Sequence, residues 1–405
     1  MVVAVACVAC GSSNKTGNNN KIMLMPDAPI DTVPDGGVGA NVVTVNLFTT
    51  PSLFMYRDGQ GTWQMPQASG LGKYKLQVTN DYEVVLVCAS GGAFQAMLQG
   101  LTIADGATQY LFCSAPSASG ATVDVTGTLA EAGTIDVGGA AQTTTAANAS
   151  FDLQVAPGTH DLVAYDADHI YVSRDQAIAA ATALGTVDID GAGSAMTALP
   201  LVIGNVGTDH LETQLQWLLA NDFANLVGSS TTLETPPASL VMQNDYEFLD
   251  VSAIGTGTFR DGSVFFTNVD PGFTLPDVLT GVDFTATPTA VTATWGTVPA
   301  YDSLNLFIDG GTVSALQQQM VTVSQSWVQA TGATSLTFDA MPPGYDASWQ
   351  VDLASEYFRA FSVATSDGMN SYNSEVVETV NGTAARPPSH AGRIHVAALR
   401  ARAQR

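Results

Sequence analysis

Polar and apolar residues alternate along much of this chain in short stretches, as they do in strands with one buried face. Residues 73–78, 122–127 and 151–155 follow this period of two, and turn residues such as Gly, Pro, Asn and Asp separate the stretches. Two continuous apolar runs, at 84–88 and 110–113, instead predict fully buried strands. The pattern therefore predicts an all-β protein built from many short strands.

Helical patterns are rare in the sequence. Residues 174–184 are rich in alanine and form one helical candidate, whereas 211–218, a second candidate, are interpreted as strands broken by turns. The motif Asn-Asp-Tyr-Glu occurs twice, at 80–83 and 244–247, each time before an apolar run. Two Pro-Gly turns, at 157–158 and 343–344, resemble these motifs in that each precedes a strand that begins with a large ring. The four positions together suggest four modules.

We therefore expect tandem immunoglobulin-like or transthyretin-like β-sandwiches after a disordered N-terminal tether. The predicted units are a partial lipoprotein signal at 1–10, a tether at 11–40, four sandwiches at 41–117, 118–200, 201–281 and 282–381, and a basic disordered tail at 382–405. A basic amphipathic helix over 394–403 is the alternative for the tail. Removal of the tail after Gly382 is expected to leave the melting temperature unchanged.

Two of these units carry motifs of known families. Val125-Thr-Gly127, Val137-Gly-Gly139 and the segment 151–164 resemble a carboxypeptidase-regulatory-like (transthyretin-like) module over residues 121–170. Val291-Thr-Ala-Thr-Trp295, the segments 301–308 and 357–363, and the turn Met341-Pro-Pro-Gly344 resemble a fibronectin type III module over 282–381. The first resemblance implies a small sandwich that is usually a non-catalytic appendage. The stretch between Ile308 and Ser335 is longer than the second pattern, and requires an extra strand or a long loop.

The first residues indicate where the protein resides. Small apolar residues lead to Val8-Ala9-Cys10-Gly-Ser-Ser13 and then to an Asn-rich spacer, an order that resembles the end of a bacterial lipoprotein signal. The resemblance implies that Cys10 carries lipid and anchors the chain in the cell envelope, at the outer membrane, facing the surface or the periplasm. No Lys or Arg precedes Cys10, and Cys7 stands where such motifs usually carry Leu. A Cys7–Cys10 redox or metal site and a plain disordered terminus remain as alternatives.

Charge and cysteine placement narrow the range of partners. The chain has 13 Lys and Arg residues against 37 Asp and Glu, a formal net charge of −24. So few cations cannot neutralise a row of phosphates, and we expect no nucleic-acid partner. Cys88 and Cys113 each end an apolar run, and in an exported protein they predict a disulfide, with two free buried thiols as the alternative.

Motifs that carry chemistry are scarce. No serine-hydrolase elbow, zinc-protease motif or phosphate-binding loop occurs. His160 and His169, beside Asp161, Asp166 and Asp168, could bind a transition metal or could simply lie on a turn and an exposed strand face. The oxygen-rich loops 188–191 and 367–373 could bind calcium or could be ordinary turns. Tryptophans that fit sugar stacking or core packing are Trp63, Trp217, Trp327 and Trp349. We expect no catalytic residue, no metal and no cofactor.

These expectations favour a non-enzymatic, lipid-anchored envelope protein with a binding, adhesion or scaffolding role toward a polysaccharide or protein ligand. The alternative is a surface hydrolase whose sandwich modules are accessory or carbohydrate-binding.

Overall fold

The structure is a computed structural model. It describes residues 41–47, 50–111, 122–219, 223–227, 232–242, 245–256, 258–266, 272–287, 290–298, 300–312, 315–339, 342–354, 358–366 and 393–401. The predicted signal and tether, including Cys10, lie outside these residues, as do Cys113 and the loop 367–373.

Strands dominate the described residues, which contain two short α-helices and two 3₁₀ turns besides. Strands form where the period of two buries one face. In β4 (Lys73–Val78), Leu76 and Val78 are buried and the intervening Gln77 is exposed. In β11 (Ala149–Val155), Phe151, Leu153 and Val155 are buried between exposed polar residues. The predicted all-β class is confirmed.

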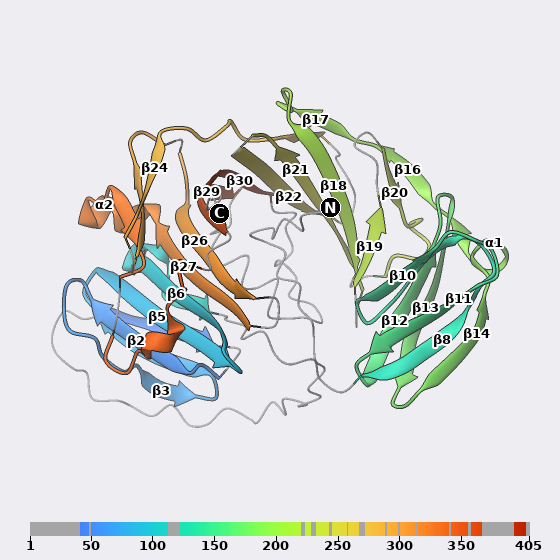
Figure 1. The fold of residues 1–405 in the computed structure, drawn as a ribbon, viewed down its shortest axis with the longest axis horizontal. Helices are drawn as coiled ribbons and strands as arrows, with labels where there is room; N and C mark the ends of the chain where they lie inside the picture. The colour runs from blue at the N-terminus through green and yellow to red at the C-terminus, as the bar shows by residue number, and fades with distance from the viewer. Residues whose placement is uncertain are drawn as a thin grey trace.

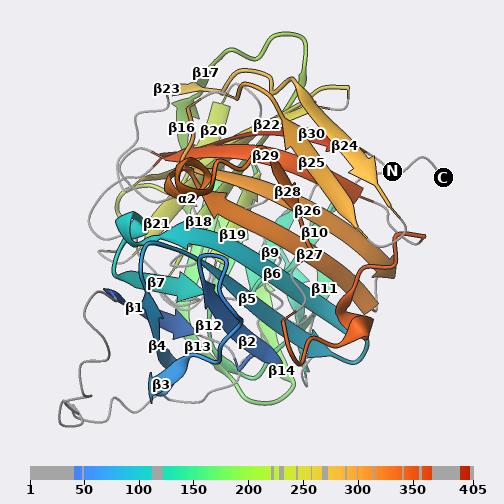
Figure 2. The same ribbon diagram turned by 90° about the vertical axis from the view of Figure 1, so that its left-hand side faces the viewer.

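One large sheet of eleven strands runs through the molecule and curves from one end to the other (Figure 1). In spatial order it contains β19 (Phe223–Val227), β18 (His210–Leu218), β21 (Tyr246–Ile254), β22 (Thr258–Phe266), β30 (Arg393–Ala401), β29 (Phe358–Ser366), β26 (Ser303–Thr312), β27 (Ala315–Ser324), β6 (Ala93–Thr102), β5 (Asp81–Ser90) and β2 (Leu53–Asp58). Neighbouring strands are antiparallel except β27 and β6, which are parallel. Figure 2 shows these two strands side by side.

At one end, the large sheet lies between two smaller sheets. One contains β3 (Gln67–Gly70), β4, β1 (Asn41–Leu47) and β7 (Thr108–Leu111), and the other β24 (Val282–Ala286), β25 (Val291–Trp295) and β28 (Ser335–Thr337). Strand β5 is therefore buried on both faces. Its Val84, Leu86 and Cys88 belong to the core shared with β1 and β4, whereas Val85 and Val87 belong to the core shared with β25 and β28.

The other end has the same layered construction. A five-stranded sheet contains β10 (Ala140–Thr144), β9 (Gly133–Val137), β12 (Gly158–Tyr165), β13 (His169–Ile178) and β15 (Ser194–Ala195), and it packs on β11, β8 (Val123–Leu129) and β14 (Thr182–Val187). Strand β12 directs Leu162 and Ala164 into that core, and Val163 and Tyr165 into a core shared with β18 and β21.

Short elements complete this end and the connections. They are the ladders of β16 (Thr197–Pro200) with β20 (Thr232–Thr235) and of β17 (Val202–Gly204) with β23 (Gly272–Thr274), the helices α1 (Ile189–Ala192) and α2 (Gln325–Thr331), and the 3₁₀ turns η1 (Ile103–Asp105) and η2 (Ala347–Trp349). No helix in the described part of the chain is long and apolar enough to cross a membrane.

The four predicted modules do not fold as four separate cores. One core joins residues from 85–98 with residues from 279–363, so the predicted units 41–117 and 282–381 are packed together. A second core joins 163–170 with 201–275, across the predicted boundary at residue 200. The sandwiches are real, but their layers come from segments far apart in the sequence.

The prediction that the tail is disordered is wrong for residues 393–401. These residues form β30, which pairs with β22 on one side and β29 on the other, and the alternative of a helix over this segment is wrong as well. Its Val396, Ala397, Ala398 and Leu399 form a short continuous apolar run between arginines, which is compatible with a strand in the middle of a sheet. Residues 393–401 of the predicted tail therefore belong inside the large sheet.

Two further expectations can be compared with the elements. Residues 174–184 form the end of β13 and the start of β14 rather than a helix, and 211–218 lie in the continuous strand β18. The long stretch after Ile308 contains the extra strand that its length requires, β27, followed by α2. This extra strand is the one that pairs with β6 and so joins two predicted modules.

Candidate functional site

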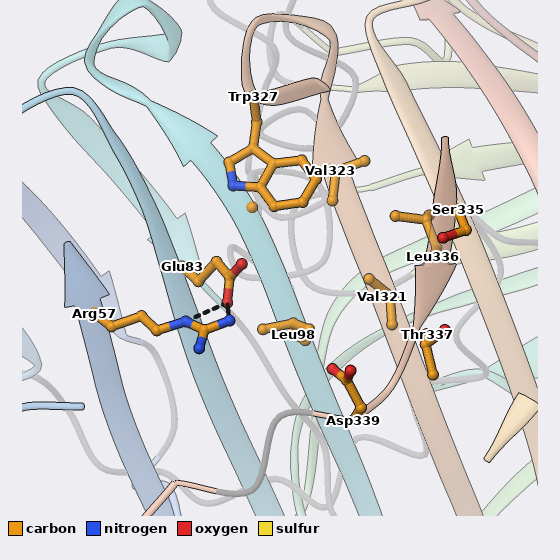
Figure 3. Close-up of a pocket in the computed structure, with 11 residues that line it drawn as sticks. Arg57, Glu83, Leu98, Val321, Val323, Trp327, Ser335, Leu336, Thr337 and Asp339 are labelled. Carbon is orange, nitrogen blue, oxygen red and sulfur yellow. Dashed lines mark hydrogen bonds and ion pairs between the residues drawn. The ribbon is translucent and has the colours of Figure 1, made fainter. Parts of the chain in front are cut away.

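A pocket of about 220 Å³ lies where α2 and β28 meet the face of the large sheet. Figure 3 shows it with the side chains that line it. They are Arg57, Glu83, Leu98, Gly100, Val321, Val323, Trp327, Ser335, Leu336, Thr337 and Asp339. The pocket thus draws on both predicted modules, 41–117 and 282–381, and exists only because they share a sheet.

Strand pairing brings together the pocket residues that lie on the large sheet, which form the floor of the pocket. Arg57 of β2 lies opposite Glu83 of β5, Glu83 lies opposite Gly100 of β6, and Gly100 lies opposite Val323 of β27. Residues paired across neighbouring strands point to the same face, so these four positions form one row. The next row on that face adds Leu98 and Val321. The floor is therefore polar toward β2 and apolar toward β27.

Gly100 makes room for the indole ring of Trp327. A Cβ atom built on Gly100 would come within 2.7 Å of the Trp327 ring, so any larger residue at this position would displace the indole. Trp327 is held at the start of α2, where its backbone N–H donates to the hydroxyl of the N-cap residue Ser324 at 3.1 Å. The indole consequently forms one end of the pocket, against the strand backbone (Figure 3).

The polar end of the pocket is built around an ion pair. Arg57 Nε donates to Glu83 Oε2 at 2.7 Å, and Arg57 Nη2 lies 2.5 Å from the same oxygen. The Arg57 guanidinium also stacks on Trp63, 4.9 Å from the ring centroid. Arg57 is therefore fixed by two contacts, and one edge of Glu83 is occupied by it.

Burial raises the pKa of the Glu83 carboxyl above its ordinary value, Arg57 opposes that shift, and the nearby Asp339 carboxylate adds to it. Asp339 itself is exposed at the mouth. Two carboxyl groups and one guanidinium give the pocket a net negative character. Such a surface accepts hydrogen bonds from hydroxyl groups and repels anions.

The pocket combines two kinds of surface that one ligand can use at once. The indole of Trp327 and the side chains of Val321 and Val323 offer an apolar face, while Glu83 and Asp339 offer hydrogen-bond acceptors. A ring with one apolar face and hydroxyl groups at its edge matches this arrangement. The volume suits a single small ring rather than a drug-sized molecule, for which pockets are roughly 300–1,000 Å³.

Of the residues predicted from the sequence, Trp327 lines the pocket and Trp63 supports it through Arg57. Trp217 is fully buried, in the core of the opposite end. Trp349 packs against Tyr345, with ring centroids 5.6 Å apart. The sugar-stacking interpretation therefore concentrates on Trp327, while core packing accounts for Trp217.

Cys88 is buried in β5 and is disulfide-bonded. Its predicted partner Cys113 lies outside the described residues, two positions beyond the end of β7. Leu111, the last residue of β7, shares a core with Cys88. This proximity supports the pairing, which stays a prediction.

The predicted metal-ligating residues are divided by the fold. His160 Nε2 lies 2.8 Å from the Ala156 carbonyl oxygen, and Asp161 is buried near Arg174. Asp166 and His169 instead lie with Asp190, from the loop predicted to fit calcium. The cluster lies at the opposite end of the molecule from the pocket, beside α1 (Figure 1).

Sequence reasoning did not identify Arg57, Glu83 or Asp339 as site residues. A signal was present, because Glu83 ends the first Asn-Asp-Tyr-Glu motif, and that motif begins a buried strand. In the second copy, the buried acid Asp245 is paired with the partly buried Arg174. A charged residue at the entrance to a buried strand requires a partner, and each motif has an arginine supplied from another strand.

No protein-family model matches the chain, and the search of curated proteins found no match.

Proposed function

We propose that the chain is a non-enzymatic, lipid-anchored cell-envelope protein that binds a small hydroxylated ring, most simply one sugar unit of a polysaccharide, in the pocket under Trp327. The observation that carries this proposal is the indole laid across Gly100 beside Glu83 and Asp339. Stacking on an indole and hydrogen bonding to carboxylates are the two contacts that such a ring uses.

Binding can be tested by titrating the full chain with a panel of monosaccharides and short oligosaccharides and measuring heat of binding. We expect Trp327→Ala to abolish binding and Glu83→Gln to weaken it about tenfold, the loss of one hydrogen bond to a charged group. Trp349→Phe is the matched control, because Trp349 does not line the pocket, and it should bind as the parent does. A sugar that binds all three variants equally would place its site elsewhere and contradict the proposal.

A surface hydrolase is the second candidate, and one observation favours it. Glu83 and Asp339 line the same pocket, and burial raises the pKa of the Glu83 carboxyl. Glycoside hydrolysis uses one protonated and one ionised carboxyl group in this way. The ion pair with Arg57 opposes protonation of Glu83, which is why we favour binding. Release of reducing sugar from a bound oligosaccharide, lost in both Glu83→Gln and Asp339→Asn, would favour the hydrolase instead.

Membrane attachment rests on the sequence around Cys10. Stable anchoring requires more than one lipid chain, as lipoproteins of this kind carry. The full-length protein, produced in a bacterium that processes lipoproteins, should partition into the detergent phase, and Cys10→Ser should move to the aqueous phase. Cys7→Ser is the matched control and should stay with the detergent. Aqueous partitioning of the unsubstituted protein would refute the anchor without affecting the pocket.

A further inference from the structure

We propose that Asp166, His169 and Asp190 form a binding site for a divalent transition-metal ion of the zinc or manganese class, separate from the pocket under Trp327. One ligand atom from each of the three residues lies within 4.8 Å of the others. Asp166 and His169 flank the turn between β12 and β13, and Asp190 belongs to α1, which follows β14. The fold therefore brings together two segments about 20 residues apart, each supplying ligand atoms.

The distance between His169 and Asp190 fits two ligands of one ion. His169 Nδ1 and Asp190 Oδ1 are 3.0 Å apart. Donor atoms bound to one zinc or manganese ion at about 2.0–2.2 Å lie roughly 3.0–3.6 Å from each other when they are adjacent in the coordination sphere. The pair therefore needs little movement to hold an ion.

The contact between these two atoms lacks the geometry of a hydrogen bond. Without a metal, they form an ion pair when the imidazole is protonated, and the His169 side chain is 35% exposed while its Nδ1 atom is shielded from solvent. A metal ion placed between Nδ1 and the carboxylates would use this nitrogen as a ligand, the commonest role of a histidine nitrogen in metal sites.

Backbone contacts hold the ligands in position. Asp166 Oδ1 accepts from the backbone N–H groups of Asp168 and His169, at 2.8 and 2.7 Å. The first residue of α1, Ile189, donates its N–H to Glu131 Oε2 at 2.8 Å. Outer contacts of this kind orient the ligands of metal sites. Three protein ligands leave positions for water, as in sites that are open rather than closed.

The donor set selects the kind of ion. One imidazole nitrogen with two carboxylates suits zinc and manganese, whereas calcium takes six to eight oxygen ligands. The ion would fasten α1 to the β12–β13 turn, and so fix one end of the five-stranded sheet. This inference replaces the expectation from the sequence that the chain has no metal.

Zn²⁺, Mn²⁺ and Ca²⁺ can each be titrated into the full chain against a fluorescent chelator. We expect one Zn²⁺ site, weaker binding of Mn²⁺, and no binding of Ca²⁺ at this site. His169→Asn should weaken Zn²⁺ binding at least tenfold. Asp190→Asn should do the same, and because Asp190 is exposed this variant tests the site even if the histidine variant folds poorly.

The matched control is His210→Asn. His210 also lies beside a carboxylate, with Nε2 3.6 Å from Glu212 Oε1, but both side chains are largely exposed and only one carboxylate is present. This variant should bind Zn²⁺ as the parent does. Zn²⁺ should raise the melting temperature of the parent and of His210→Asn, but not of His169→Asn or Asp190→Asn.

Three outcomes would overturn the inference. They are the absence of Zn²⁺ binding, Zn²⁺ binding that His169→Asn and Asp190→Asn leave unchanged, and a site that takes Ca²⁺ in preference to Zn²⁺. The second outcome would place the metal elsewhere in the chain, for instance at Cys7 and Cys10.

Discussion

Arg174 joins the two sandwiches at one end of the molecule, and replacing it with methionine should weaken that joint. Its guanidinium makes two hydrogen bonds to Asp245, at 3.0 and 2.6 Å, and one to the Leu240 carbonyl oxygen at 3.1 Å. It lies 4.0 Å from a carboxylate oxygen of Asp161 and 5.3 Å from the ring centroid of Trp217. The side chains of Asp161 and Asp245 are both fully buried.

The expected loss follows from what Arg174→Met leaves behind. Methionine keeps most of the apolar stem, so little packing is lost. Both carboxylates, however, lose the only arginine that contacts them among the described residues. Removing one partner of a buried ion pair costs about 3–5 kcal/mol, because the remaining charge stays buried. Against a total stability of about 5–15 kcal/mol, this is a large share.

Urea unfolding monitored by tryptophan fluorescence can measure the change. Trp217 lies under the Arg174 guanidinium, so its emission reports on this joint. Adding Asp245→Asn to Arg174→Met removes one of the two buried carboxylates that lose their arginine contact, and the double variant should be more stable than Arg174→Met alone. Glu212→Gln is the matched control, because the His210–Glu212 pair is exposed and should contribute under about 1 kcal/mol.

The reasoning would be refuted if Arg174→Met lowered the free energy of unfolding by less than about 1 kcal/mol, the contribution of an exposed ion pair. It would also be refuted if Asp245→Asn gave no recovery in the Arg174→Met background. In either case the joint would depend on the apolar core between the sandwiches, and not on the buried charges.

Three further predictions concern other parts of the chain. Burial raises the pKa of Asp309 from 3.8 to about 6, so the protonated carboxyl stabilises the fold below pH 3.8 and this contribution is lost as the pH rises through 6. The free energy of unfolding of Asp309→Asn should therefore increase relative to that of the parent by up to about 3 kcal/mol as the pH rises from 4 to 7. A difference that does not change with pH in urea unfolding would contradict this. Deleting the residues after Gly382 removes β30 from between two strands and should lower the melting temperature, whereas an unchanged value would show that this strand contributes nothing. Alkylation followed by intact-mass measurement should find Cys88 and Cys113 protected until the protein is reduced, and labelling of both without reductant would exclude their disulfide.

The fold class could be predicted from the sequence because alternation is a local property. The exposed and buried positions of β4 and β11 can be assigned from the residues themselves. The position of β27 could be inferred only as a need for extra length, since its partner β6 lies in another predicted module. Strand β30 was missed because its arginines favoured disorder, and its short apolar run does not by itself distinguish a strand from a helix.

The candidate site depends on pairings that no local pattern encodes. Trp217 and Trp327 are indistinguishable as sequence signals, yet one is fully buried and the other lines a pocket. Arg57 and Glu83 meet because β2 pairs with β5, and Gly100 matters only because α2 places an indole over it. The same limit holds for the metal site, where Asp190 comes from a different segment.

The parallel pairing of β6 with β27 has a consequence for how the chain is made. The hydrogen bond between Thr102 and Ser326, just beyond this pair, joins residues 224 positions apart. At a synthesis rate of about 5–20 residues per second, β6 emerges roughly 10–45 s before its neighbour. Throughout that interval it presents the unpaired edge of an apolar strand, which is a template for association with other chains. During synthesis, pairing of β6 with edges of other chains therefore competes with its later pairing with β27.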